Sequence, residues 1–278
     1  MTEWLRRNRL AAVGVVIVAL LVFASLFGPW ISPYDPTVQD LPARLTGPSM
    51  DHLFGTDELG RDIFSRVLVG TRISLRVGAT VVLISALVGV GVGGAAGFIG
   101  GRLDTFINVF VINSLMAFPS ILLAIGLVAF LGPGLDNLIL ALSVIGWVGY
   151  ARLARGQVLK VKNLDFVEAE RALGATGARV FLRHVLPNIV QPIMVQASIV
   201  MAAMILAEAT LSFLGLGIAP PTPSWGSMLS DARGHLFDAP HMVVFPSLIL
   251  MATVLSFNFL GDAIRDWLDP KSLAIPKD

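Results

Sequence analysis

The sequence predicts an all-α, polytopic membrane protein with six transmembrane helices and one long cytoplasmic connection. Of the 278 residues, 55% are hydrophobic and only 14% are charged, and the mean hydropathy is +0.78. Soluble domains carry about a quarter charged residues. Six apolar runs follow one another along the chain, and a membrane-spanning helix needs about 20 such residues. Basic residues gather around a single connection, which sets the predicted orientation.

The first predicted span covers residues 10–31, which carry no charge and follow the basic residues Arg6, Arg7 and Arg9. A signal peptide also begins with a basic segment and an apolar run, but this run is too long and lacks a small-x-small cleavage site. We therefore expect a transmembrane helix whose N-terminus is cytoplasmic. Six spans place both chain ends in the cytoplasm, and the other five are expected at residues 77–101, 105–131, 135–157, 189–216 and 241–260.

The connection 32–76 is expected to be the outer loop. Four prolines make its first half irregular: Pro33, Pro36, Pro42 and Pro48. Its second half is expected to form an amphipathic helix on the membrane surface, with an apolar face made of Ile63, Phe64, Val67 and Leu68. Arginines in this half would lie outside, against the positive-inside rule, but long loops are weak topology signals.

Glycines recur every fourth residue in the second span, at Gly89, Gly93, Gly97 and Gly101. Such a stripe lets another helix approach closely, so we predict a helix-packing face. Residues 89–94 also match the GxGxxG dinucleotide pattern. That pattern belongs between a strand and a helix, whereas these residues lie inside an apolar span, and we reject nucleotide binding.

The third span is expected to kink at Pro119, and the fourth to end where Arg152 and Arg155 reach the cytoplasmic interface. Residues 158–187 are then the predicted cytoplasmic loop. The basic residues that place it there are Arg152, Arg155, Lys160, Lys162, Arg171, Arg179 and Arg183. The net charge of +1 and the lack of a basic block give no footprint for nucleic acid.

Glu208 is the acidic residue of the predicted fifth span. An ionisable group at membrane depth is costly and usually faces protein or a water-filled cavity. Two interpretations stay open: a pathway or gating role, or a structural role near the outer interface or paired with a neighbouring subunit. In the outer loop that follows, Trp225 is expected to anchor the chain at the membrane interface.

Residues 165–187 predict two short helices joined by a tight corner. Asp165 can cap the first helix, and Glu168 would complete a capping box. Gly174 ends this helix because glycine readily adopts the left-handed conformation. Thr176 is expected to cap the second helix, and Pro187 to mark the turn back to the membrane. The expected apolar stripes are Phe166, Ala169, Ala172 and Leu173 on the first helix, and Val180, Phe181, Val185 and Leu186 on the second.

The pairs Glu168-Ala169 and Leu186-Pro187, with Gly174 between them, resemble the EAA motif of ABC importer permeases in residue type and spacing. Two positions depart from it, where Glu170 replaces alanine and His184 replaces an aliphatic residue. The resemblance implies a coupling helix that sits in a cleft of an ATPase subunit. The residues that it implies in ATPase coupling are Glu168, Ala169, Arg171, Ala172, Gly174, Ala175, Leu186 and Pro187. An amphipathic interfacial hairpin, with Glu168 only as a cap, satisfies the local pattern equally well.

Four segments extend the resemblance over nearly the whole chain: GTDELGRDIFSRVLVGTRISL, the EAA-like stretch, AEATLSFLGLGIAPPTPSWGSML and GDAIRDWLDP. In this order they resemble the C-type permease subunit of the dipeptide/oligopeptide/nickel ABC importers. The resemblance implies the type I ABC importer permease fold in the inner membrane. It also implies a homologous second permease, two ATPase subunits and an extracytoplasmic solute-binding protein, within surrounding membrane lipid. ATP and Mg are expected in the ATPase subunits.

This chain itself is expected to be non-catalytic and to hold no cofactor or metal. It has no GxxxxGK[ST] loop for ATP, no cysteine, and its histidines follow no metal-binding spacing. The alternative is a stand-alone secondary carrier with Glu208 as its proton site, although no internal repeat supports it. An intramembrane enzyme is the third class. Peptides are the cargo that the resemblance implies, but close relatives also move glutathione, nickel chelates and opines.

Overall fold

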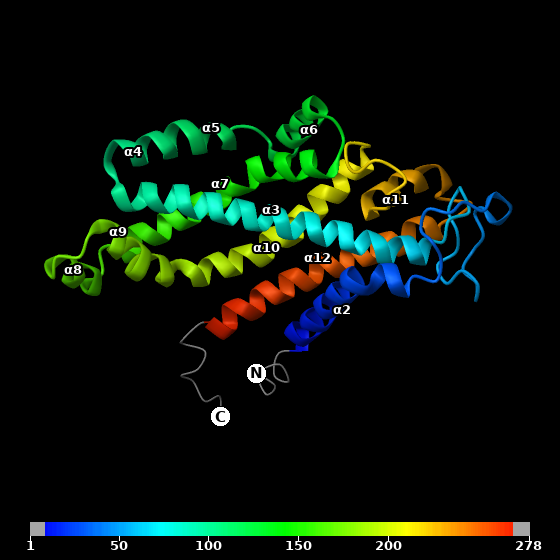
Figure 1. Ribbon diagram of the computed structural model, residues 1–278, viewed down its shortest axis with the longest axis horizontal. Helices are drawn as coiled ribbons and strands as arrows, with labels where there is room; N and C mark the ends of the chain where they lie inside the picture. Colours follow the sequence, from blue (N-terminus) through cyan, green and yellow to red (C-terminus); the bar gives the residue numbers. More distant parts are fainter. Residues whose placement is uncertain (1–8, 269–278) are drawn as a thin grey trace.

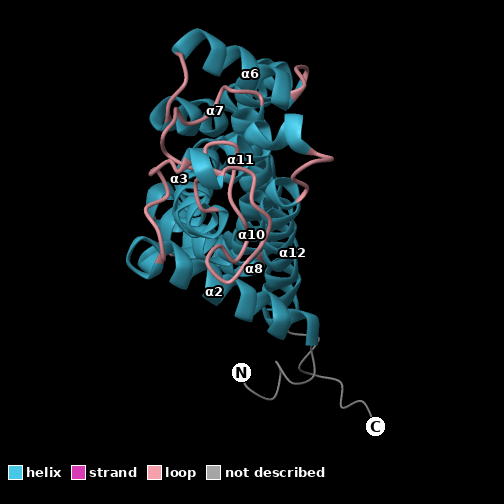
Figure 2. Ribbon diagram, turned by 90° about the vertical axis from the view of Figure 1, so that its right-hand side faces the viewer, coloured by secondary structure: helices cyan, strands magenta, loops and turns pink. Residues whose placement is uncertain are grey.

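The computed structural model describes residues 9–268 and shows an elongated bundle of helices, without a β-strand in that range (Figure 1). The long helices run along the bundle, with α8 and α9 at one end and α11 and the long loop at the other. Figure 2 shows α6 and α7 at one edge of the cross-section and α2 and α12 at the opposite edge. The helices are α2 (Arg9–Ile31), α3 (Ile63–Ile99), α4 (Gly101–Thr105), α5 (Asn113–Met116), α6 (Ser120–Leu131), α7 (Leu135–Val161), α8 (Asp165–Ala172), α9 (Gly177–Val180), α10 (Leu186–Phe213), α11 (Trp225–Asp231) and α12 (His241–Leu268). Two π-helical segments, η2 (Phe106–Ile112) and η3 (Phe181–Val185), and two 3-10 turns, η1 (Leu41–Ala43) and η4 (Ala232–His235), complete them.

Five of these helices are long and apolar enough to cross a membrane, and a sixth crossing results if one bent pair counts as a single span. The chain is thus a multi-pass, all-helical membrane protein, as its composition predicts. The expected basic residues Arg6, Arg7, Lys271 and Lys277, and the end of the GDAIRDWLDP segment, lie outside the described residues.

The second span begins earlier than the sequence predicts. Asp62 caps α3 by accepting a hydrogen bond from the backbone N–H of Ser65 at 2.8 Å, and the helix continues without a break to Ile99. The expected separate surface helix is therefore wrong: its residues form the first turns of the spanning helix. Ile63 and Val67 are buried against the loop-end elements, so they face protein.

The third span is broken instead of kinked. The helical segment 101–116 and the helix Ser120–Leu131 meet at an angle of 83° on either side of Pro119. Proline lacks the N–H that would continue the helical ladder, and the residue before it avoids the helical conformation. This segment is consequently either one broken crossing or a re-entrant loop.

α3 and α7 share the most extensive helix–helix contact in the bundle. A Cβ added at Gly89 or Gly93 would overlap backbone atoms of Trp147 or Ala151, and one at Gly97 would lie 3.2 Å from the Cα of Arg155. Three glycines at four-residue spacing thus lie against three α7 residues at the same spacing. Gly101 is the exception, since it follows the end of α3 and no atom lies within 4 Å of its Cβ position.

Trp225 is buried, which corrects the prediction of an interface anchor. The first residue of α11, it packs in a core cluster with Leu75 and Ile205, and its indole N–H donates to the carbonyl oxygen of Val67 at 3.3 Å. A capping box at Ser224 and Ser227 starts the helix. The loop between α10 and α12 therefore folds back into the bundle.

Candidate coupling site

The first helix of the EAA-like stretch is α8, and it begins without the expected capping box. Leu164 occupies the N-cap position with extended backbone angles, and no side chain caps the helix. Asp165 and Glu168 both lie inside the first helical turn, where their negative charges suit the helix dipole. Because the chain enters the helix one residue earlier than predicted, the Asp165 carboxylate cannot act as its cap.

The corner after α8 follows the prediction closely. Gly174 has a φ of +84°, in the left-handed region, and no atom lies within 4 Å of its Cβ position. Thr176 then caps α9, and its hydroxyl oxygen accepts from the backbone N–H of Arg179 at 3.4 Å. The expected turn at Pro187 is absent, because Pro187 is the second residue of α10, which continues directly from the π-helical segment η3. Helix runs on from Gly177 to Phe213 as one candidate span.

A small hydrophobic core holds this corner on the membrane helices. Val167 of α8, Val180 of α9 and Val185 of η3 are fully buried against Ala154 and Val158 of α7. Val180 and Val185 of the second predicted stripe belong to this core, and Phe181 and Leu186 pack against it. The stretch is thus packed as one body with the end of α7.

Phe98, near the end of α3, connects this core to a second membrane helix. Its ring lies 5.2 Å from the ring of Phe181, and the guanidinium carbon of Arg171 lies 5.6 Å from its centroid. A cation over an aromatic face is attracted by the ring quadrupole. Nothing local in the sequence indicates this contact, because Phe98 and Arg171 are far apart along the chain.

Polar contacts brace the same end of the bundle. The guanidinium of Arg155 donates two hydrogen bonds to Asp104, at 2.5 and 2.7 Å, which join α7 to α4. The ammonium of Lys162 donates to the carbonyl oxygen of Gly97 at 2.7 Å, at the end of α3. In addition, the imidazole of His184 lies 3.6 Å from the carboxylate of Glu170. The two residues that differ from the EAA motif are thus neighbours in the structure.

Most of the motif residues are exposed. Glu168, Ala169, Arg171, Ala172, Gly174 and Pro187 are exposed, whereas Ala175 and Leu186 are half-buried and pack against the core. The first predicted stripe is exposed too, with 83% of Leu173 and 42% of Phe166 open to solvent. α8 therefore buries Val167 on one side and leaves apolar side chains exposed on the other.

Glu208 lies elsewhere, in the middle of the bundle near α11. Its side chain is fully buried and accepts hydrogen bonds from the hydroxyls of Ser74, at 2.8 Å, and Ser212, at 2.7 Å. Its partners thus belong to this chain, on α3 and α10. This geometry ties two spanning helices together.

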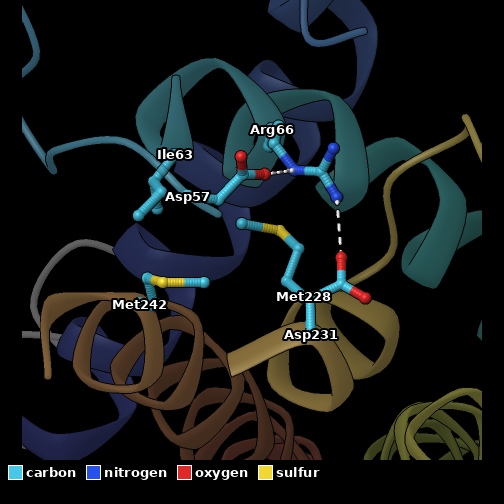
Figure 3. A pocket seen from close by; sticks show the side chains of 6 residues that line it. All are labelled: Asp57, Ile63, Arg66, Met228, Asp231 and Met242. Carbon is cyan, nitrogen blue, oxygen red and sulfur yellow. Dashed lines mark ion pairs between the residues drawn. The ribbon is translucent and has the colours of Figure 1, made fainter. Parts of the chain in front are cut away.

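A charged cluster joins the long loop to α3 and α11 (Figure 3). Arg66 lies 3.4 Å from Asp57 and 3.5 Å from Asp231, and Arg61 also pairs with both carboxylates. Burial raises the pKa of Asp231 above its usual range, and the guanidiniums of Arg66 and Arg61 oppose that rise. The cluster encloses a cavity of about 10 Å³, so it serves to clamp the loop and offers no room for a solute.

Among residues 9–268, no three His, Cys, Asp or Glu side chains are grouped so that they could hold a metal ion. The arrangement at the α8 end has no nucleophile with a neighbouring base. What it offers is an exposed surface on a rigid support, linked to the ends of α3 and α7.

Comparisons with known proteins identify the family. Residues 89–273 match the family described as "Binding-protein-dependent transport system inner membrane component", and residues 4–48 match the "N-terminal TM domain of oligopeptide transport permease C". The glutathione transport system permease protein GsiD of Escherichia coli O1:K1 / APEC, of Escherichia coli O157:H7 and of Shigella sonnei (strain Ss046) is 46% identical over 267 residues, which cover 96% of this chain and 88% of each relative. The chain therefore belongs to the binding-protein-dependent transport system inner membrane components, the non-catalytic permease subunits of ABC importers.

Proposed function

We propose that this permease imports small peptides and that its α8 end is where an ATPase subunit docks. Permeases of this family work in the membrane with a partner permease, an ATPase and a binding protein. The complete assembly would be a heterodimer of homologous permeases with two ATPase subunits, which hold ATP and Mg, and an extracytoplasmic solute-binding protein.

The observation that carries the docking proposal is the exposed apolar face of α8. Leu173, directly after α8, is 83% exposed and Phe166 is 42% exposed, although Val167 of the same helix is fully buried. Exposed apolar side chains on a well-supported helix favour a protein partner. Ala169 and Ala172 of the motif belong to this exposed stripe, and Gly174 follows Leu173 at the corner.

The proposed orientation of the chain in the membrane follows from the basic residues at the α8 end. Basic residues concentrate at the α7–α9 end of the bundle, as the positive-inside rule requires for cytoplasmic segments. With α8 in the cytoplasm, the long loop and α11 face outward, and an even number of crossings returns both termini to the cytoplasm. The broken segment at Pro119 counts as one crossing in this arrangement.

In the proposed mechanism, movement of the ATPase subunits is coupled to movement of the transmembrane helices. ATP closes the ATPase dimer, the body formed by residues 165–187 moves with it, and the attached ends of α3 and α7 transmit the movement to the spans. The cavity between the permeases switches from inward- to outward-facing, and the binding protein releases its cargo into it.

For the cargo we propose a small peptide of the glutathione kind. The support is the likeness to the GsiD relatives, which are glutathione transport system permease proteins. Selectivity depends largely on the binding protein, so the class of cargo extends to other di- and oligopeptides.

Affinity purification of the tagged chain from native membranes in mild detergent, followed by peptide mass spectrometry, tests the proposal. We expect a second permease, one or two ATPases and a binding protein, whose bound solute identifies the cargo. Recovery of this chain alone, under conditions that keep a known importer intact, would overturn the docking proposal in favour of a stand-alone carrier.

A further inference from the structure

A groove between α2 and α3 contains two arginines that no other described residue neutralises. Arg72 and Arg76 are exposed and line a groove of about 750 Å³. Within residues 9–268, neither guanidinium forms a hydrogen bond, an ion pair or a ring contact. No acidic side chain lines the groove; its other residues are Val18, Val22, Ser25, Leu26, Phe27, Trp30, Leu75, Ala79, Met201 and Phe257.

The two arginines lie one turn apart on the same face of α3. Side chains at i and i+4 on a helix are neighbours, and two like charges in these positions repel each other. An anion between them would remove that repulsion, and a phosphate suits guanidinium groups because its oxygens accept paired hydrogen bonds. The local charge therefore favours a phosphate-bearing ligand.

We infer from the uncharged stretch of α3 that the two arginines lie at the level of lipid headgroups. Residues 77–99 of α3 carry no charge, and about 20 apolar residues cross the hydrocarbon core of a bilayer. Arg76 lies directly before this stretch, on the side of the long loop, and Arg72 lies one turn further toward the loop. Trp30, which is 79% exposed, lines the same groove, and tryptophan is enriched at this interface.

The rest of the groove is apolar. Val18, Val22 and Leu75 lie further from the loop end than Trp30 and Arg72, and Met201 and Phe257 form part of the floor. An acyl chain can lie along such a surface while its headgroup stays at the arginines. A soluble anion would leave these side chains uncovered.

We propose that this groove binds an anionic glycerophospholipid, with its phosphate between Arg72 and Arg76 and an acyl chain against the apolar wall. The proposal requires only that the chain spans a membrane, so it stands apart from the proposed cargo and partners. A bound lipid there would join the outer ends of α2 and α3.

Native mass spectrometry of the purified full-length chain, titrated with phosphatidylglycerol or phosphatidylcholine, tests the site. We expect the wild type to retain phosphatidylglycerol in preference, and the double variant Arg72→Gln/Arg76→Gln to bind it about tenfold more weakly. The matched control is Arg179→Gln/Arg183→Gln, an exposed arginine pair with the same spacing at the opposite end, which we expect to bind as the wild type does. Equal retention by both double variants would overturn the proposal.

A second measurement identifies the occupant without relying on the arginine variants. A photo-reactive amino acid at Val22, which is 45% exposed within the groove, is activated in native membranes. An adduct with the mass of a phospholipid supports the proposal. An adduct with another polypeptide would contradict it, because the groove would then be a subunit interface.

Discussion

At the scale of single residues, Gly174 offers the sharpest test of coupling. A side chain there meets no neighbouring atom, so Gly174→Val acts only through its φ of +84°, at a cost of about 1–2 kcal/mol. We expect the variant to insert in the membrane and to lose the coupling of ATP hydrolysis to uptake. Reconstituted vesicles, in which both rates are measured, provide the readout.

Gly156→Val is the matched control for this variant. Gly156 is also exposed, has no atom within 4 Å of its Cβ position and lies inside α7 without a positive φ. We expect it to keep both rates close to those of the wild type. Normal uptake by Gly174→Val would refute the argument from the corner.

Glu208 gives a second test, which separates a structural role of its buried carboxyl from a gating role. Removing the carboxyl in Glu208→Ala leaves the buried hydroxyls of Ser74 and Ser212 without their acceptor, which costs about 1–3 kcal/mol for each unpaired group. We expect a lower melting temperature in detergent for this variant. Glu208→Gln keeps an acceptor and should retain both stability and uptake. A Gln variant that is stable yet fails to transport would support the gating interpretation instead.

Single residues were predictable from the sequence where local backbone chemistry decides the outcome. Gly174 and Thr176 take the conformations that their types favour. Asp165 does not cap its helix, because a shift of one residue in the helix start moves the carboxylate inside the first turn. Helix boundaries depend on tertiary packing as well as on local preference.

At the scale of helices, the α3–α7 contact depends on close backbone approach. In Gly93→Ala, the new methyl group would overlap the backbone of Ala151, and we expect a loss of about 1–3 kcal/mol, the usual cost of overpacking. Thermal unfolding of the purified chain measures it. Gly91→Ala, on the same helix with open space at its Cβ position, should keep or slightly raise the melting temperature, because alanine favours a helix more than glycine does. An equal change in both variants would mean that the close approach of α7 does not limit the side chain at Gly93.

The contact between α3 and the α8 end makes a separate prediction. Phe98→Ala removes the ring against which Arg171 and Phe181 lie, and so weakens that attachment by about 1–3 kcal/mol. We expect ATP hydrolysis by the assembled importer to persist while uptake falls. Phe110→Ala, at a ring that is 63% exposed, serves as the control. If Phe98→Ala lowers both rates in proportion, the ring supports assembly and does not transmit movement.

The helices themselves follow from hydropathy, but their limits and their continuity do not. Composition alone predicts a surface segment for the first turns of α3, because these turns contain charged residues. Asp62 caps the helix, and Asp57 and Asp231 pair with Arg66, so these first turns belong to the same helix as the span. Pro119 is a second example. Its position in the sequence predicts a kink in the third span, but the angle of 83° depends on the packing around it.

At the scale of the whole molecule, contacts between distant segments decide the architecture. Trp225 lies against Val67, and Phe98 against Arg171, although no local pattern relates either pair. A single sequence carries no direct signal for such pairs. Family resemblance therefore predicted the architecture better than the spacing of residues did, whereas the buried contacts that hold the α8 end came only from the structure.

The loop end of the molecule is expected to respond to pH. The imidazole of His235 lies 2.9 Å from the carboxylate of Asp238 and 3.6 Å from that of Glu58, so it links the long loop to η4. Its hydrogen bond to Asp238, with the charges of both carboxylates, raises the pKa of His235 above the ordinary 6.5, and the same bond lowers the pKa of Asp238 below 3.8.

Because the folded pKa of His235 is raised, the stabilisation is fully present below pH 6.5 and is lost as the pH rises through the folded value. Asp238 stays charged throughout that window. We expect hydrogen exchange, corrected for its intrinsic pH dependence, to show less protection around residues 56–60 and 232–240 at pH 9 than at pH 6. His235→Gln should abolish this difference, while His184→Gln, at the α8 end, should preserve it. A difference that survives in His235→Gln would assign the pH response to another group, and the link between the loop and η4 would then depend on the Arg61–Arg66 cluster alone.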